Sequence, residues 1–309
     1  MKVGGRDVAR GVAAALALGF LAFVALVQYA PDSVAFSPNN YGWNGLQGVA
    51  STYGVSFTDS LASLPSRAVL VVSQPSIGFS RSDVASIENF LLGGGTLLVA
   101  DKSGVANSLL KGLGSSVTIQ SAYTISDQTY NWKGSTVPTA LVLTNARSQF
   151  PFVANVTGIG LSQPSPLLVS NSKATDLAIT SQFSTSNAPG NPRGPFVVMA
   201  AQRYGNGTLI VVGDSQLLLN SGWTIADNRA LIGNLFANTS VFIDASHWGV
   251  SSIAQLKAEL GDVYGFISAS PWRYFMTLLL VGLALALVPG SESENRPTPF
   301  NSRREGVNE

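Results

Sequence analysis

The sequence predicts a three-layer α/β domain with a mainly parallel sheet, helices on both faces and a β-rich insertion, flanked by two transmembrane helices. Three observations predict it. Short apolar, often β-branched runs alternate with segments whose apolar residues recur at helical spacing. The runs are apolar at successive positions, as in strands buried on both faces of a sheet. Two long uncharged segments lie near the ends of the 309-residue chain.

The first predicted strands and helices follow one another closely. The run at 68–72 (AVLVV) has the length of a buried strand, and helical periodicity over 81–92 begins at a suitable N-cap, Ser82 or Asp83. Glycines 93–95 follow a helix and precede a strand, the reverse of a phosphate-binding loop, so they predict a turn. The next elements are a strand over 96–100 and a short helix over 105–113.

The pattern returns toward the end of the chain. Apolar runs at 196–200 and 208–212, joined through Gly205-Asn206-Gly207, predict a hairpin. A helix over 226–237 and a strand over 241–244 follow. Residues 115–195 are rich in Ser, Thr, Asn and Pro and alternate only weakly, so we interpret them as the β-rich insertion, with long loops.

The two apolar segments predict membrane spans. Residues 11–30 carry no charge and at 1.5 Å per residue reach about 30 Å, the thickness of the hydrocarbon core. The second span covers 271–289, with Trp272 and Tyr274 at a suitable interfacial position. A buried core helix is the alternative for each, and a cleaved signal peptide is a further alternative for the first.

Flanking cations give the predicted orientation. Lys2, Arg6 and Arg10 precede the first span, which places the N-terminus inside. The sequence therefore predicts a cell-membrane protein with two spans and both termini cytoplasmic. The remaining parts are a cytoplasmic N-terminus (1–10), an extracytoplasmic α/β domain (31–250), a juxtamembrane helix (251–270) and a disordered cytoplasmic tail (290–309).

The chain resembles the membrane-anchored domain-of-unknown-function family 4350, whose ectodomain looks like a class I glutamine amidotransferase. The resemblance covers roughly residues 33–250. It rests on the stretches 37–45, 93–101, 205–215, Asn220 with 227–228, and 244–249. It implies a membrane-linked assembly, with an AAA ATPase of the MoxR type and a von Willebrand-type protein as partners beside the lipid bilayer.

The composition argues against catalysis and against several ligand classes. The chain has no Cys and one His, His247, so the Cys–His pair of amidotransferase relatives is impossible. No G-x-S-x-G motif offers a serine substitute. Charged residues make up 11% of the chain without a cluster of cations, which excludes nonspecific nucleic-acid binding. We therefore expect no enzyme, no catalytic residue, no cofactor and no metal.

Polar side chains at the carboxyl edge of the predicted sheet form the candidate ligand site, because open α/β sheets bind ligands there. They are Asn39, Asn40, Asp101, Asp214 and Ser215. Asp101 and Asp214 with the Asn oxygens suit a hydroxyl-bearing ligand or a hard cation. The structural alternative is that these residues cap helices and shape turns.

Two further features belong to the predicted outer domain. Asn155, Asn206 and Asn238 fit the N-glycosylation pattern. Tyr41, Trp43, Tyr130 and Trp132 form either a contact surface or part of the core.

Three functions follow from these observations. The leading hypothesis is a non-catalytic, membrane-tethered binding or scaffold module. One alternative is a ligand- or sugar-binding protein, or a hydrolase, that uses Asp101 and Asp214. The other is an auxiliary subunit of a transport complex.

Overall fold

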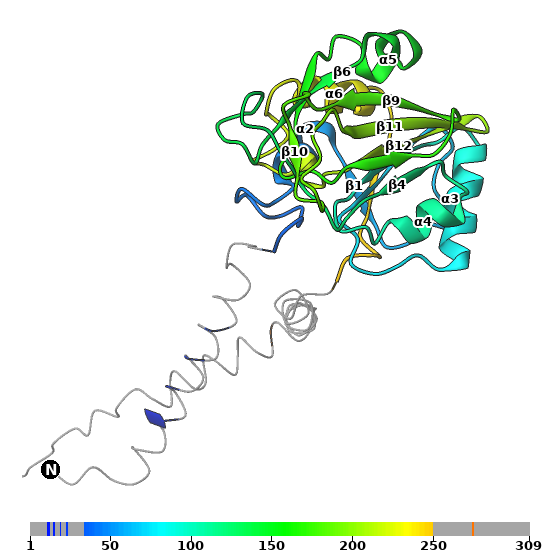
Figure 1. The fold of residues 1–309 in the computed structure, drawn as a ribbon. Coiled ribbons are helices and arrows are strands. Elements are labelled where there is room, and N and C mark those ends of the chain that lie inside the picture. Colours follow the sequence, from blue (N-terminus) through cyan, green and yellow to red (C-terminus); the bar gives the residue numbers. More distant parts are fainter. Residues whose placement is uncertain are drawn as a thin grey trace, which may run out of the picture. The chain divides into compact units, whose positions relative to one another are not determined.

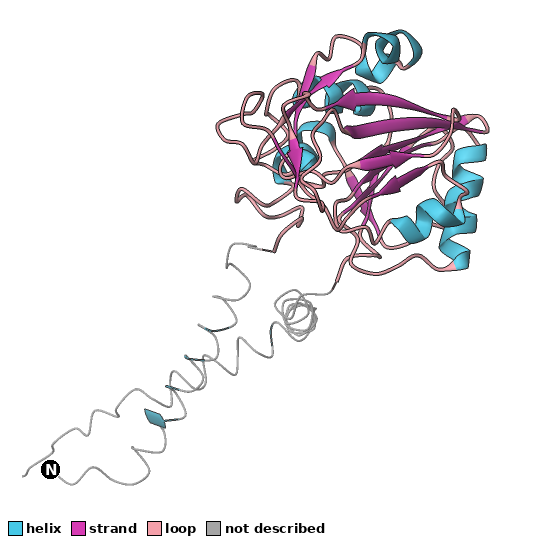
Figure 2. Cartoon of the chain, in the orientation of Figure 1, coloured by secondary structure: helices cyan, strands magenta, loops and turns pink. Residues whose placement is uncertain are grey.

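A nine-stranded mixed sheet forms the centre of the computed structural model (Figures 1 and 2). The structure describes residues 34–249 and the isolated positions 11, 12, 15, 19, 23 and 274. Residues 34–249 lie within one unit, Pro31–Ala254, and the two terminal segments group as a second unit. The account below concerns the first unit.

The strands of this sheet come from the whole length of the unit. In spatial order they are β1 (Ser56–Thr58), β13 (Val241–Asp244), β2 (Val69–Ser73), β3 (Thr96–Ala100), β12 (Gly207–Val212), β11 (Val197–Tyr204), β9 (Ala174–Ile179), β6 (Thr139–Val142) and β7 (Gly158–Gly160). Strands β1 to β12 in this order run parallel. The pairs from β12 to β7 are antiparallel. Two small sheets pair β5 (Ile125–Ser126) with β10 (Thr185–Ser186) and β4 (Val117–Ile119) with β8 (Leu167–Val169).

The central strands are buried on both faces, as their continuous apolar runs require. In β2, Val69 and Val71 face one core while Leu70 and Val72 face the other. The first core is covered by α2 (Gln47–Tyr53), α5 (Thr144–Gln149), α6 (Asn228–Phe236) and the 3₁₀ helices η1 (Pro151–Val153) and η2 (Gln216–Leu218). The second core is covered by α3 (Arg81–Leu92) and α4 (Asn107–Gly112), which lie together on one side in Figure 1.

Helix α3 has the predicted bounds but a different cap. Ser80 is the N-cap, and its hydroxyl accepts the Asp83 N–H while the Asp83 carboxylate accepts the Ser80 N–H. This capping box satisfies two N–H groups that lack partners within the helix and contributes about 1 kcal/mol. Asp83 is therefore its third residue, not its cap.

The prediction of a mainly parallel sheet is wrong, because only one half of the sheet is parallel. The predicted hairpin itself reverses the direction: Tyr204 pairs with Gly207, and Gly205 turns the chain at φ +56°. The predicted insertion then supplies β9, β6 and β7, which continue the same sheet in antiparallel pairing. Residues 115–195 are thus partly an extension of the sheet.

The predicted membrane architecture also needs correction. No helix within the described residues combines the length and hydropathy that crossing a bilayer requires. This finding contradicts the predicted two-span fold and the cell-membrane localisation with an extracytoplasmic domain. The segments predicted as spans, 11–30 and 271–289, lie outside the described residues except for isolated positions, as do 1–10, 251–270 and 290–309.

Candidate functional site

Two neighbouring parallel strands, β3 and β12, bring Asp101 and Asp214 to the same edge of the sheet. Asp101 directly follows β3, and its N–H donates to the Val212 carbonyl at the end of β12. Asp214 lies two residues beyond that carbonyl. Both side chains are buried. The structure thus brings the two predicted carboxylates to one edge, but their partners differ.

Asp101 accepts hydrogen bonds from the loop that directly follows it. Its Oδ1 accepts the Ser103 N–H and hydroxyl, both at 2.7 Å, and its Oδ2 accepts the Ala106 N–H at 3.0 Å. These bonds order the turn that leads into α4. Asp101 therefore fits the structural alternative, in which these polar residues shape turns instead of binding a ligand.

Among the described residues, only backbone N–H groups donate to Asp214. Its Oδ2 accepts the Ser162 N–H at 2.7 Å and its Oδ1 accepts the Gln216 N–H at 2.9 Å. Burial raises the pKa of Asp214 to about 6, although both N–H donors and the nearby Lys102 oppose this shift. Because a carboxylate has about four acceptor positions, Asp214 keeps acceptor capacity beyond these two bonds.

Gly213 allows the chain to bring these partners together. A Cβ at Gly213 would lie 2.0 Å from the Ser165 carbonyl oxygen, so only glycine fits. The Ser165 N–H donates to the Gly213 carbonyl at 2.8 Å, which holds the loop after β7 against the end of β12. That contact places Ser162 over Asp214.

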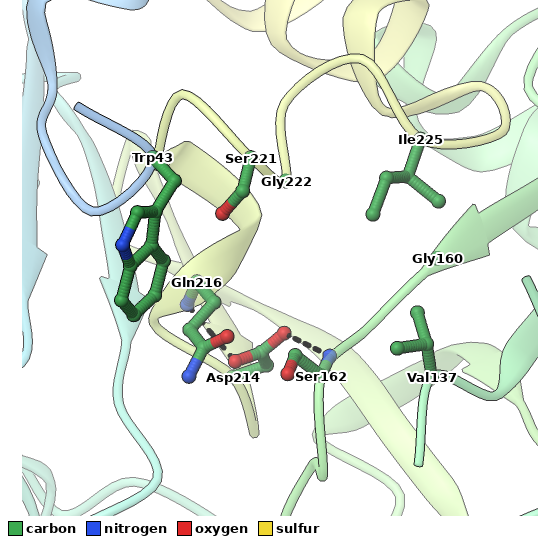
Figure 3. Close-up of a pocket in the computed structure, with 9 residues that line it drawn as sticks. All are labelled: Trp43, Val137, Gly160, Ser162, Asp214, Gln216, Ser221, Gly222 and Ile225. Atoms are coloured by element: carbon green, nitrogen blue, oxygen red, sulfur yellow. Dashed lines mark hydrogen bonds between the residues drawn. The ribbon is translucent and has the colours of Figure 1, made fainter. Parts of the chain in front are cut away.

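A cavity of about 210 Å³ opens beside Asp214. Figure 3 shows the Trp43 indole on one side, Val137 and Ile225 on the other, and Asp214 with Ser162 between them. The remaining lining residues are Gly160, Gln216, Ser221 and Gly222. Typical ligand pockets hold about 300–1,000 Å³, so this cavity suits a small molecule or one unit of a longer chain. Asp214 is the one acidic or basic residue in its lining.

Asn40 and Asn220 fix the loop that carries Trp43. The Asn40 amide donates to the Val34 carbonyl and to the Asn44 Oδ1, and its Oδ1 accepts the Gly42 N–H. The Asn220 amide donates to the carbonyls of Asn40 and Gly42. Asn40 therefore positions the site without lining the cavity.

Two predicted site residues lie apart from the cavity lining. Asn39 is exposed, and its N–H donates to the Ser37 hydroxyl. The Ser215 hydroxyl donates to Oε1 of Gln74, which follows β2. Of the five predicted residues, Asp214 alone lines the cavity.

Sequence reasoning missed most of the lining. Ser162 and Val137 come from the insertion, where weak alternation gave no basis for placing them. Gln216 and Ser221 belong to the segment after β12. The one available signal was for Gln216, which lies two positions after Asp214, because Asp side chains accept from the backbone N–H two residues on. Trp43 was recognised only as an aromatic of uncertain exposure.

His247 forms a second polar cluster, which the local sequence pattern does not predict. Its Nδ1 donates to the Asp244 Oδ2 at 2.7 Å, and its Nε2 lies 3.5 Å from the Asp83 Oδ2. The ring stacks on Phe79 with centroids 3.8 Å apart. A cavity of about 510 Å³ adjoins it, lined partly by Ser80, Ser82, Ser86 and Ser246. Within the described residues, no group of three or more His, Asp or Glu side chains is placed to hold a metal ion.

The three N-glycosylation candidates all lie on the surface. Asn155, Asn206 and Asn238 are exposed in loops or turns, and Asn155 and Asn238 have positive φ. Their modification stays a prediction.

The chain belongs to the family described as Domain of unknown function (DUF4350), whose model matches residues 35–236. The family resemblance is thereby confirmed, whereas its membrane anchoring and amidotransferase-like fold are not. No curated protein matches the chain.

Solved structures give only distant likenesses. The N-terminal domain of mmIFT52 has 15% identity and a TM-score of 0.49, over 67% of this chain and 93% of that one. A β-galactosidase from Bacillus circulans sp. alkalophilus has 14% identity and a TM-score of 0.33, over 51% of this chain and 22% of that one. A cytoplasmic protein from Salmonella typhimurium LT2 has 10% identity and a TM-score of 0.39, over 63% and 86%. These values carry no argument about function.

Proposed function

We propose that this protein is a non-catalytic binding module that holds a small, neutral, hydroxyl-bearing molecule in the cavity beside Asp214. The observation that carries the proposal is a buried carboxyl group that borders a cavity and receives hydrogen bonds only from two backbone N–H groups. A buried polar group with spare capacity favours a ligand that completes its hydrogen bonds.

The lining indicates the chemistry of the ligand. Asp214 accepts hydrogen bonds, while the hydroxyls of Ser162 and Ser221 and the Gln216 amide both donate and accept. Trp43, Val137 and Ile225 offer apolar surface on two sides (Figure 3). The Asp214 carboxylate would repel an anionic ligand, and the nearby Lys102 already offsets part of the charge that would attract a cation. A molecule with hydroxyl groups and apolar C–H faces matches both kinds of contact.

The proposed absence of catalysis rests on the chemistry of His247. Covalent catalysis by a serine needs a base within hydrogen-bond reach of the hydroxyl. The Nδ1 of His247 is bonded to Asp244, and its Nε2 faces the Asp83 carboxylate. The Ser246 hydroxyl lies 3.0 Å from the same Nδ1, but it donates to the Asp244 Oδ1 at 2.6 Å, and a nitrogen that donates to Asp244 cannot also take the serine proton. The Asp214 cavity contains no histidine.

Thermal unfolding in the presence of neutral polyols and monosaccharides tests the proposal. A ligand at about 100 times its Kd stabilises the folded state by about 2.7 kcal/mol, which raises Tm by about 5 °C or more for a domain of this size. At least one such compound is expected to raise the Tm of the wild-type protein and not that of the Trp43→Ala variant.

Asp101→Asn is the matched control, because Asp101 lies at the same edge and does not line the cavity. It should keep the ligand-dependent rise in Tm. The proposal fails if no neutral hydroxyl compound raises Tm, or if Trp43→Ala responds as the wild type does.

A further inference from the structure

Within residues 34–249, five large aromatic side chains are exposed, and we call them the aromatic rim. Their exposed fractions are 79% for Tyr41, 69% for Trp43, 49% for Tyr130, 43% for Trp132 and 50% for Phe183. Clustered exposed aromatics mark interaction sites, because water solvates their faces poorly. Exposure therefore excludes the core interpretation of Tyr41, Trp43, Tyr130 and Trp132, while the contact surface stays a prediction.

The aromatic rim is connected to the Asp214 cavity at two points. Trp43 lines the cavity directly. On the opposite side, Val137 lines it and accepts the Trp132 N–H at its carbonyl, at 2.8 Å. The Tyr130 carbonyl accepts the Thr139 N–H in the same hairpin, so Tyr130 and Trp132 are carried by the loop that borders the cavity.

The hairpin and its neighbour present these rings as a fixed surface. The Tyr130 and Phe183 rings stack, with centroids 6.4 Å apart and an interplanar angle of 11°. The buried Asp127 holds both segments: its Oδ1 accepts the Thr129 and Tyr130 N–H groups, and its Oδ2 accepts the Ser181 hydroxyl. Ring surfaces held in this way lose little conformational freedom on binding.

We propose that the occupant of this surface is an oligosaccharide, with one sugar unit in the Asp214 cavity and further units stacked along the aromatic rim. This inference rests on the proposed function and extends it from a small ligand to a chain. Sugar units present hydroxyl groups at their edges and C–H groups on their faces, which match the polar cavity and the aromatic planes in turn. A proline-rich peptide also packs on aromatic planes, but it brings no series of hydroxyl donors to Asp214.

Calorimetric titration with linear gluco-, manno-, galacto- and xylo-oligosaccharides of one to six units tests the inference. One series is expected to bind, with the hexasaccharide roughly tenfold or more tighter than its monosaccharide, because each added sugar ring gains a stacking contact with the aromatic rim. Trp132→Ala and Tyr130→Ala should each weaken the hexasaccharide roughly fivefold and leave the monosaccharide unchanged. Leu168→Ala removes an equally exposed apolar side chain outside the aromatic rim and should change neither.

The outcomes separate this inference from the proposed function. Monosaccharide binding without dependence on chain length, or hexasaccharide binding that both aromatic variants retain, overturns the inference and leaves the small-ligand site intact. The inference is also overturned, and the small-ligand site kept, if a non-sugar polyol binds in a manner that needs Trp43 while no sugar series binds. A proline-rich peptide that binds at the aromatic rim while every sugar fails also overturns it. If no sugar and no polyol binds, both proposals fall.

Discussion

Two polar regions at the carboxyl edge of the sheet differ in what their side chains contact. In the His247 cluster, side chains satisfy one another. Asp244 accepts from His247 and Ser246. Asp83 faces the His247 Nε2 and also accepts the Ser80 N–H at the start of α3. Both regions adjoin a cavity, but the Asp214 carboxyl group accepts from two backbone N–H groups and from no side chain of the described residues. We therefore expect the ionisable cluster around His247 to stabilise the fold, and we propose that the Asp214 carboxyl group serves binding.

The largest expected effect is on stability, at His247. His247→Ala leaves the buried Asp244 without its main partner, and we expect a loss of about 3 kcal/mol in the free energy of unfolding, measured in urea. The double variant Asp244→Asn, His247→Ala should lose less than the sum of the two single variants, since the groups act as a pair. Loss of ligand response at the Asp214 cavity in a folded His247→Ala protein would contradict the comparison.

Asp214 should give the opposite dependence of stability on pH from an ordinary paired carboxylate. Its folded pKa, about 6, is raised above the unfolded value of 3.8, so the folded state binds the extra proton between these values. Stability therefore falls as pH rises from 3.8 through 6, by about 3 kcal/mol for this group alone.

Asp214→Asn should lack this component, so the difference between the two proteins in urea at pH 4 and pH 7 measures it. Burial also raises the pKa of Asp176, but Asp176 is common to both proteins and cancels. A wild-type minus variant difference that is independent of pH would contradict the assignment.

Asp101 should behave as a structural residue at the same edge. Asp101→Ala leaves the Ser103 and Ala106 N–H groups without their acceptor, which costs about 2 kcal/mol. Ligand affinity at the Asp214 cavity should stay within twofold of the wild type. A tenfold or greater loss of affinity in the folded variant would show that Asp101 and Asp214 act together. That result would favour the alternative prediction of a site that uses both carboxylates.

Trp43 should show the smallest effect on stability. Because its side chain is 69% exposed, Trp43→Ala should change the free energy of unfolding by less than about 0.5 kcal/mol. Its loss should nevertheless weaken ligand binding roughly tenfold, since it forms one wall of the cavity. Calorimetry with the ligand found by thermal unfolding checks the affinity, and unfolding without ligand checks the stability.

The parts of the fold that the sequence predicted well are those with strong local signals. The runs at 68–72 and 96–100 are strands within one residue of their predicted bounds, and helix 81–92 has its predicted bounds. Register and direction depend on contacts distant in the sequence. The β11–β12 hairpin was predicted, but its antiparallel continuation through β9, β6 and β7 was not. Local pattern cannot tell which edge of a sheet an insertion will extend.

The site was predicted only in part for the same reason. The carboxyl-edge rule located Asp101 and Asp214, but which of them meets a cavity depends on Ser162, Trp43 and Gly213, which come from three separate segments. His247 was recognised only as the lone histidine: its partner Asp244 lies three residues before it, but Asp83 is far away in the sequence. Contacts of this kind are set by tertiary structure alone.

The most direct test of the central claim is an amide NMR titration with the neutral polyol or sugar that raises Tm most. The N–H groups of Ser162 and Gln216 donate to Asp214 and report directly on its carboxyl group. We predict that the largest shifts fall on these two amides and on the Trp43 indole, while the Ser103 and Ser246 amides stay unchanged. Largest shifts at the His247 cluster, or no shift at Ser162 and Gln216 at saturation, would contradict the account.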